Sequence, residues 1–267
     1  MNKKIIFFVA AFMLVANVAK AQDEDDNYIF THLGAGLSLG LDGIGVEVAA
    51  PCTPYLGIRA GISFIPKISV NIKDISYDRN NPNHDAKASA KASFKKIDGK
   101  LLFDAYPFGN KYSFHVTAGL FIGSNELITA SLKEDPEEPI GGGIVKQIGQ
   151  AEWDVKADPK THEVDFRLKT NVVKPYVGIG FGRMVPKPTK RVGVSCDIGV
   201  QFHGTPEFQG YATASTASGD KHQWVTLEGK DFNFDKSFND DVDKALDIIH
   251  KVKIWPVLNI RITGRIF

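Results

Sequence analysis

The sequence predicts an all-β fold, an up-and-down barrel of eight antiparallel strands, from three observations. The first is strict alternation between residues 192 and 202, where apolar side chains alternate with glycines and single polar residues. Successive side chains of a strand point to opposite faces, so this pattern predicts a strand with one apolar face. The second is that the pattern recurs in eight segments, and the third is that short and long connections alternate between them. An even number of strands lets such a sheet close on itself.

The predicted strands follow one another from the N-terminal region to the last residues of the chain. Each places aliphatic or aromatic side chains at every second position, as a half-buried strand does. Their expected ranges are 28–41, 44–49, 56–64, 98–106, 112–122, 173–182, 192–202 and 257–266.

The connections divide into two classes. Those after the second, fourth and sixth strands are short, with the sequences PCTP, FGN and VPKPTK. Those after the third, fifth and seventh strands are long and cover 67–97, 124–172 and 204–256. Short turns on one side and long loops on the other are typical of outer-membrane barrels.

The long connections also contain regular patterns. Alternation in 68–72 and 86–94 predicts that the third and fourth strands continue beyond the barrel, and 161–170 predicts another strand. An apolar stripe of Val242, Ala245, Leu246 and Ile249 predicts one helix at about 238–251 that packs locally.

Alternation alone does not decide which face of the barrel is inside. A soluble barrel of lipocalin type turns its apolar face inward and shows the same pattern. Glycines on the polar face, long loops on one side and aromatic residues at the strand ends favour a membrane barrel. The aromatic residues expected at its two rims include Tyr106, Phe108, Tyr112, Phe64, Tyr176, Phe202 and Trp255. We therefore predict an eight-stranded antiparallel up-and-down transmembrane β-barrel with long extracellular loops and both termini periplasmic.

Residues 1–21 have the pattern of a secretory signal peptide. Two lysines precede an apolar run, and Ala19-Lys20-Ala21 forms a small-x-small cleavage site. The apolar run is shorter than the ~20 residues that a membrane-spanning helix needs. We therefore expect residues 22–267 to form the mature domain in the bacterial outer membrane. Its nearly balanced charge gives no indication of a nucleic-acid partner.

Two cysteines are expected to remain free thiols. Cys52 lies in the PCTP turn, whereas Cys196 lies on the apolar face of a distant strand. Cys196 would then act as a small hydrophobic residue.

Charged residues at lumen-facing positions are the candidate functional residues. Glu47 and Arg59 are equally far from the PCTP turn, which predicts a cross-strand ion pair. The same symmetry pairs Asp104 with His115, and Asp197 can form an ion pair with Arg261. Eight strands leave room only for side chains or one small ligand, so we predict a lumen closed by salt bridges. The predicted network contains Glu47, Arg59, Lys100, Asp104, His115, Asp197, Arg261 and Arg265.

No motif predicts a catalytic, cofactor-binding or metal site. His162-Glu163 lacks the second histidine of a zinc-protease helix, and the glycines at 141–143 are not followed by the Lys-Ser/Thr of a phosphate-binding loop.

The chain resembles the small outer-membrane β-barrel proteins of the porin superfamily found in Bacteroidota, built like the OmpA transmembrane domain. GIGVEVAAP, YLGIRAGISFIPK, KPYVGIGFGR, RVGVSCDIGVQF and the terminal PVLNIRITGRIF carry the resemblance. Such barrels usually end with an aromatic residue on the lipid face. Here Phe267 has the parity of Arg265, so either a bulge at Gly264 resets the phase or the terminal signal is atypical.

The expected function is non-enzymatic: a monomeric envelope protein in contact with outer-membrane lipids, whose loops 67–97, 124–172 and 204–256 bind an extracellular ligand or protein. One alternative is an enzyme that modifies lipids of the outer leaflet. It would need a base and a nucleophile near the lipid face, where the sequence places no His-Ser pair. The other alternative, a narrow channel for small solutes, is opposed by the strand number and the lumen charges.

Overall fold

The structure, a computed structural model, describes residues 32–78, 85–109, 111–134, 144–148, 151–158, 160–186, 190–216, 219–232 and 236–266. The predicted signal peptide, the start of the first predicted strand and Phe267 lie outside these ranges.

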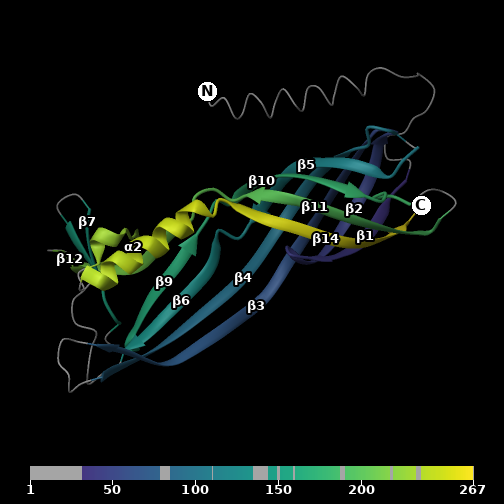
Figure 1. The fold of residues 1–267 in the computed structure, drawn as a ribbon. Coiled ribbons are helices and arrows are strands. Elements are labelled where there is room, and N and C mark those ends of the chain that lie inside the picture. The colour runs from purple at the N-terminus through teal and green to yellow at the C-terminus, as the bar shows by residue number, and fades with distance from the viewer. Residues whose placement is uncertain are drawn as a thin grey trace.

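Eight strands, each antiparallel to two neighbours, form a closed circuit that we call the ring (Figure 1). The order is β3-β2-β1-β14-β11-β10-β5-β4, and β3 pairs with β4 to complete it. Closure is uneven, because β1 has 7 residues and β3 has 23. The ring strands are β1 (Gly34–Gly40), β2 (Gly43–Thr53), β3 (Leu56–Asp78), β4 (Asp85–Ala105), β5 (Phe114–Gly123), β10 (Val173–Phe181), β11 (Val192–Phe202) and β14 (Ile254–Arg265).

The sheet is larger than the predicted eight-stranded barrel, because the described residues form one sheet of 14 strands. Six further strands continue the sheet from β4 in the order β6-β9-β12-β8-β7, with β13 on β12. They lie within two of the three long connections, where only β9 was predicted as a strand, at 161–170. Figure 1 shows them extending beyond one end of the ring. They are β6 (Glu126–Glu134), β7 (Ile144–Ile148), β8 (Ala151–Val155), β9 (Glu163–Lys169), β12 (Glu207–Thr216) and β13 (Gly219–Thr226).

The predicted helix and the predicted continuation of two strands are confirmed. Helix α2 (Lys236–Lys251) follows a short 3-10 turn, η1 (Gly229–Asp231). β3 and β4 run far past the ring, with an irregularity in their pairing between Ile65 and Ile68. We call the six further strands, η1, α2 and the parts of β3 and β4 beyond this irregularity the extension.

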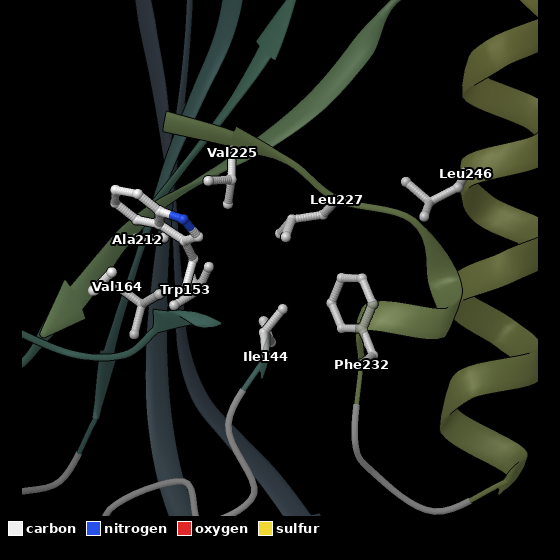
Figure 2. Close-up of a cluster of buried hydrophobic side chains, with 10 residues drawn as sticks. Ile144, Trp153, Val164, Ala212, Val225, Leu227, Phe232 and Leu246 are labelled. Atoms are coloured by element: carbon white, nitrogen blue, oxygen red, sulfur yellow. The ribbon is translucent and has the colours of Figure 1, made fainter. Parts of the chain in front are cut away.

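The extension folds around its own core, shown in Figure 2. Two positions of the predicted helix stripe, Val242 and Leu246, pack against this core, while Ala245 is exposed. The buried members are Ile144, Trp153, Val155, Val164, Ala212, Ala214, Val225, Leu227, Phe232 and Leu246. A core of this size makes the extension a folded unit rather than a set of loops.

The ring turns its apolar face outward. Each of its strands carries an aliphatic side chain that is 42–64% exposed: Leu37, Val46, Ile62, Leu101, Val116, Ile179, Val194 and Ile260. We call this band the apolar girdle. The intervening side chains point inward, so the ring has the reverse polarity of a soluble barrel.

Some expectations for individual residues need correction. Tyr106 and Tyr176 are buried inside the ring and do not lie on its outer rims. The pairing of β14 runs through Gly264 without a shift, so no bulge resets its phase there. Both cysteines are free, as predicted. None of the described helices is long and apolar enough to span a membrane.

Candidate functional site

Glycines make the interior of the ring wide enough for large polar side chains. A Cβ atom on Gly180 would lie 2.4 Å from both Asp197 Oδ1 and His115 Nε2. A Cβ atom on Gly178 or Gly199 would lie 2.4 or 2.5 Å from the Tyr176 hydroxyl oxygen. The glycine-rich face seen in the sequence therefore leaves room for interior side chains that a methyl group would displace.

Arg59 on β3 lies at the centre of the interior and contacts three carboxylates. Its Nε is 3.0 Å from Asp104 Oδ2, and its Nη1 is 3.1 Å from Asp197 Oδ2 and 3.5 Å from Glu47 Oε2. Its Nη2 also donates a hydrogen bond to Thr117 Oγ1 at 3.3 Å. The fixed fork of a guanidinium group lets one side chain reach partners on several strands at once.

Arg261 on β14 shares two of these carboxylates. Its Nε is 2.8 Å from Glu47 Oε2, and its Nη2 is 2.7 Å from Asp197 Oδ2. His115 Nε2 lies 2.7 Å from the other oxygen of Asp197. Asp197 and Glu47 therefore each bridge two arginines, which links β2, β3, β11 and β14 across the interior.

Lys100 extends this cluster. Its Nζ lies 2.5 Å from Glu47 Oε1 and 3.4 Å from Asp42 Oδ2. Sequence reasoning did not include Asp42, because it lies in the turn between β1 and β2 rather than at a strand position.

A second ionic cluster was not predicted. Lys96 and Lys174 place Nζ 3.0 and 2.6 Å from the two oxygens of Asp98. The Nζ of Lys96 also donates to Gln201 Oε1 at 3.0 Å and lies 5.4 Å from the centre of the Trp255 ring. The signal was present in the sequence, because Lys96 and Asp98 share the parity of Lys100 on β4. The predicted strand began only at residue 98.

An apolar layer lies in contact with both clusters. It consists of Leu102, Phe121, Tyr176 and Val257, with Trp255 packed against it. The Nζ atoms of Lys96 and Lys100 lie 6.0 and 5.9 Å from the centre of the Phe121 ring. Phe121 therefore lies between the two clusters, and its ring makes a cation–π contact with both ammonium groups.

The predicted cross-strand pairs were wrong in register. Glu47 lies opposite Gly61 and Arg59 opposite Ala49, because the chain turns between Thr53 and Leu56 and not at the centre of PCTP. Glu47 and Arg59 are therefore diagonal neighbours, and the closest carboxylate to Arg59 is Asp104.

The other predicted pair was also wrong in register, by two residues on β5, although the β4–β5 pairing has no shift. Asp104 lies opposite Thr117, which donates a 2.6 Å hydrogen bond to it, and His115 contacts Asp197 instead. Arg265 lies apart from the cluster and is half-buried, with its Nη2 2.8 Å from His32 Nδ1. The other seven predicted residues lie together.

The charges of the interior balance. Ten formally charged side chains in the two clusters are each at most 5% exposed: Arg59, Lys96, Lys100, Lys174, Arg261, Asp42, Glu47, Asp98, Asp104 and Asp197. Five are cationic and five are anionic, so their formal charges sum to zero. The described residues contain no group of three or more potential metal ligands. This arrangement fits a closed interior held by ion pairs.

Comparison with known proteins identifies no family. No family model matches the chain, and no curated protein matches it. Among solved structures, the chain is similar to CarO2 of Acinetobacter baumannii, with 19% identity, 88% of this chain and 98% of that chain covered, and a TM-score of 0.45. CarO of the same organism gives 18%, 90%, 99% and 0.44.

A major outer membrane protein of Thermus thermophilus is more distant. It shows 13% identity, with 88% of this chain and 98% of that chain covered and a TM-score of 0.29. At these values the similarities say nothing of ligands or activity, so the function is inferred from the geometry of the ring and the extension.

Proposed function

We propose that the chain is an outer-membrane β-barrel with a closed lumen, and that it presents the extension as a non-enzymatic binding domain at the cell surface. One observation carries the proposal: the ring exposes aliphatic side chains on all eight strands and buries ten charged ones inside. A water-soluble protein arranges these two kinds of side chain the other way round.

Exposure of the apolar girdle is energetically favourable only in contact with lipid. A continuous exposed apolar band makes a protein aggregate in water, whereas hydrocarbon chains cover it without cost. In the interior, burying an isolated charge would cost several kcal/mol. The multiple contacts of Arg59 and Arg261 offset this cost, because each carboxylate there meets at least one cation.

The extension then faces the outside of the cell. It lies at the end of the ring opposite the short turns that join β2 to β3 and β10 to β11. The first and last described residues of the ring lie on the short-turn side, where Ile266 N donates a 2.7 Å hydrogen bond to Leu33 O. Long segments of outer-membrane barrels are extracellular, which makes both termini periplasmic. We expect a monomer, because the ring satisfies its own strand edges.

The two alternatives find little support. The described residues include one hydroxyl–imidazole hydrogen bond, 2.9 Å between Thr213 Oγ1 and His222 Nδ1. It joins opposite residues of β12 and β13, far from the ring, where it cannot act on membrane lipid (Figure 1). A channel is disfavoured because Arg59, Asp104 and Asp197 fill the middle of the ring with mutual contacts.

Fractionation and conductance test the proposal together. The full chain expressed in a Gram-negative host should sediment with the outer membrane and migrate differently on gels before and after boiling, as folded barrels do. In planar bilayers it should give no steady ion conductance. Recovery from the soluble periplasm would refute the membrane assignment, and steady single-channel currents would refute the closed lumen.

A further inference from the structure

A polar pocket of about 360 Å³ lies on the outward side of the extension. Strands β3, β4, β6 and β9 line it with three lysines, several hydroxyl groups and one carboxylate. The side chains used below are Lys67, Lys91, Lys133, Ser89, Ser131 and Glu163.

The pocket lies on the same side of the sheet as the apolar girdle. On β4, Ile97 is 42% exposed at the edge of the girdle, and the next outward residue, Lys95, is exposed as well. Lys91 follows on the same side, since side chains alternate along the strand. The opposite side of β4 points inward there, because Phe94 stacks on Trp255 with ring centres 5.7 Å apart.

The pocket begins just beyond the lipid band. Lys91 lies six positions from Ile97, about 20 Å along a strand and about 14 Å in height at a typical tilt of 45°. This height exceeds the headgroup layer of a simple phospholipid, about 5–7 Å on each side of the hydrocarbon. A larger saccharide headgroup with phosphate groups would reach it.

Within the described residues, no ion pair neutralises the three lysines of the pocket. Lys67, Lys91 and Lys133 are exposed, and none makes a salt bridge with any residue that the structure describes. The one acidic side chain of the lining is Glu163, which lies opposite Lys133 in the β6–β9 register. Asp165, next to the pocket, accepts a 2.6 Å hydrogen bond from Ser131 Oγ. The lining therefore keeps a positive excess beside hydroxyl donors, which suits phosphate oxygens.

We infer that this pocket binds a phosphate group of a glycolipid headgroup in the outer leaflet, with Lys67, Lys91 and Lys133 as its cationic contacts. The inference rests on the proposed function, because only a barrel in the outer membrane brings this face against such a headgroup. Ser89 donates a hydrogen bond to the bound phosphate, and Glu163 opposes it. Binding in this orientation holds the extension against the membrane surface.

The test titrates the purified full chain in detergent with lipopolysaccharide that carries phosphates on its core saccharide and with its fully dephosphorylated form. One variant carries Lys67→Gln, Lys91→Gln and Lys133→Gln. Its control carries Lys156→Gln, Lys244→Gln and Lys251→Gln, which remove the same charge from lysines already paired with aspartates. Because the first variant loses three exposed charge contacts, we expect it to bind the phosphorylated lipopolysaccharide about tenfold more weakly. The control should stay within about twofold of the unmodified chain.

Two further measurements sharpen the result. Glu163→Gln should tighten binding of the phosphorylated lipopolysaccharide by about twofold, because it removes the only carboxylate of the described lining. Neither triple variant should change binding of the dephosphorylated lipid.

Four results would overturn the inference. These are equal loss of both lipids, no loss in the pocket variant, equal loss in the control, and lysine-dependent binding of inorganic phosphate without binding of the lipid. The last would assign the pocket to a free anion. Fractionation of the same cells separates the two proposals. A chain absent from the outer membrane refutes the proposed function, whereas a chain present there without lysine dependence refutes only this inference.

Discussion

The ring and the extension share strands β3 and β4 but place opposite chemistry on the inside. Within the ring, the inward side of β4 carries Asp98, Lys100 and Asp104. Within the extension, the same side continues through Phe94 and then alanines that are half-buried. Because side chains of one strand alternate with a fixed period, the change from charged to apolar is encoded only in residue type.

The surroundings of each region explain the difference. Lipid cannot solvate charges, so the ring keeps them inside, where glycines leave room and opposite charges meet. Water solvates the extension, so its apolar side chains gather between the sheet and α2. The two regions should therefore respond oppositely to the same kind of substitution.

The largest effect is expected for Arg59→Met in the ring. It leaves three carboxylates without one of their cations, and breaking a buried pair costs about 3–5 kcal/mol. In the extension, Lys251→Gln removes a 3.3 Å pair with Asp247 in which both side chains are more than 70% exposed, and should cost less than about 0.5 kcal/mol. Urea unfolding in lipid vesicles measures both.

A double mutant identifies the main partner of Arg59. Asp104→Asn combined with Arg59→Met should recover more stability than Glu47→Gln does, because Asp104 makes the 3.0 Å contact and Glu47 the 3.5 Å contact. Purely additive losses in both double mutants would mean that these residues do not interact.

The second effect concerns the core of the extension. Leu227→Ala removes a fully buried side chain and should destabilise the extension by about 3 kcal/mol through the lost contacts and the cavity left behind. The ring should keep its shift in gel migration on boiling, since its interior does not include Leu227. Limited proteolysis of the extension combined with this gel assay measures both regions. Loss of the shift would mean that the two regions unfold as one unit.

The third effect compares the same substitution, isoleucine to lysine, at two exposed positions. Ile260→Lys on β14 places a charge in the girdle and should cost about 2–3 kcal/mol of stability in lipid. Ile248→Lys on α2, where the side chain is 63% exposed, should change stability by less than about 0.5 kcal/mol. Equal effects at both sites would show that the girdle does not face lipid.

The smallest effect tests the space that glycine provides in the ring. In Gly180→Ala the new methyl group meets Asp197 and His115 at 2.4 Å and should cost about 1–2 kcal/mol through displaced contacts. Gly264→Ala is the matched control, because its Cβ atom would meet no atom closer than 3.9 Å. Equal unfolding midpoints for the two variants would contradict the close packing of the interior.

Much of the ring could be predicted from the sequence because alternation is local. A strand forces neighbouring side chains to opposite faces, so Arg59, Asp197 and Arg261 could be assigned to the polar face before any pairing was known. The free state of the two cysteines was also predicted, because Cys52 was placed in the PCTP turn and Cys196 on a distant strand.

The tertiary structure alone decided the contacts and the extent of the sheet. The turn between Thr53 and Leu56 and the shift between Pro51 and Thr53 together set the β2–β3 partners, and the alternation marks neither. The extension depends on pairings such as β4 with β6 and β6 with β9, which join segments far apart in the chain, and β7 and β8 have only 5 residues each. Periodicity is a property of one strand, whereas register and sheet membership depend on a partner strand. The sequence therefore determined which face each side chain occupies, and only the fold determined which residues contact one another.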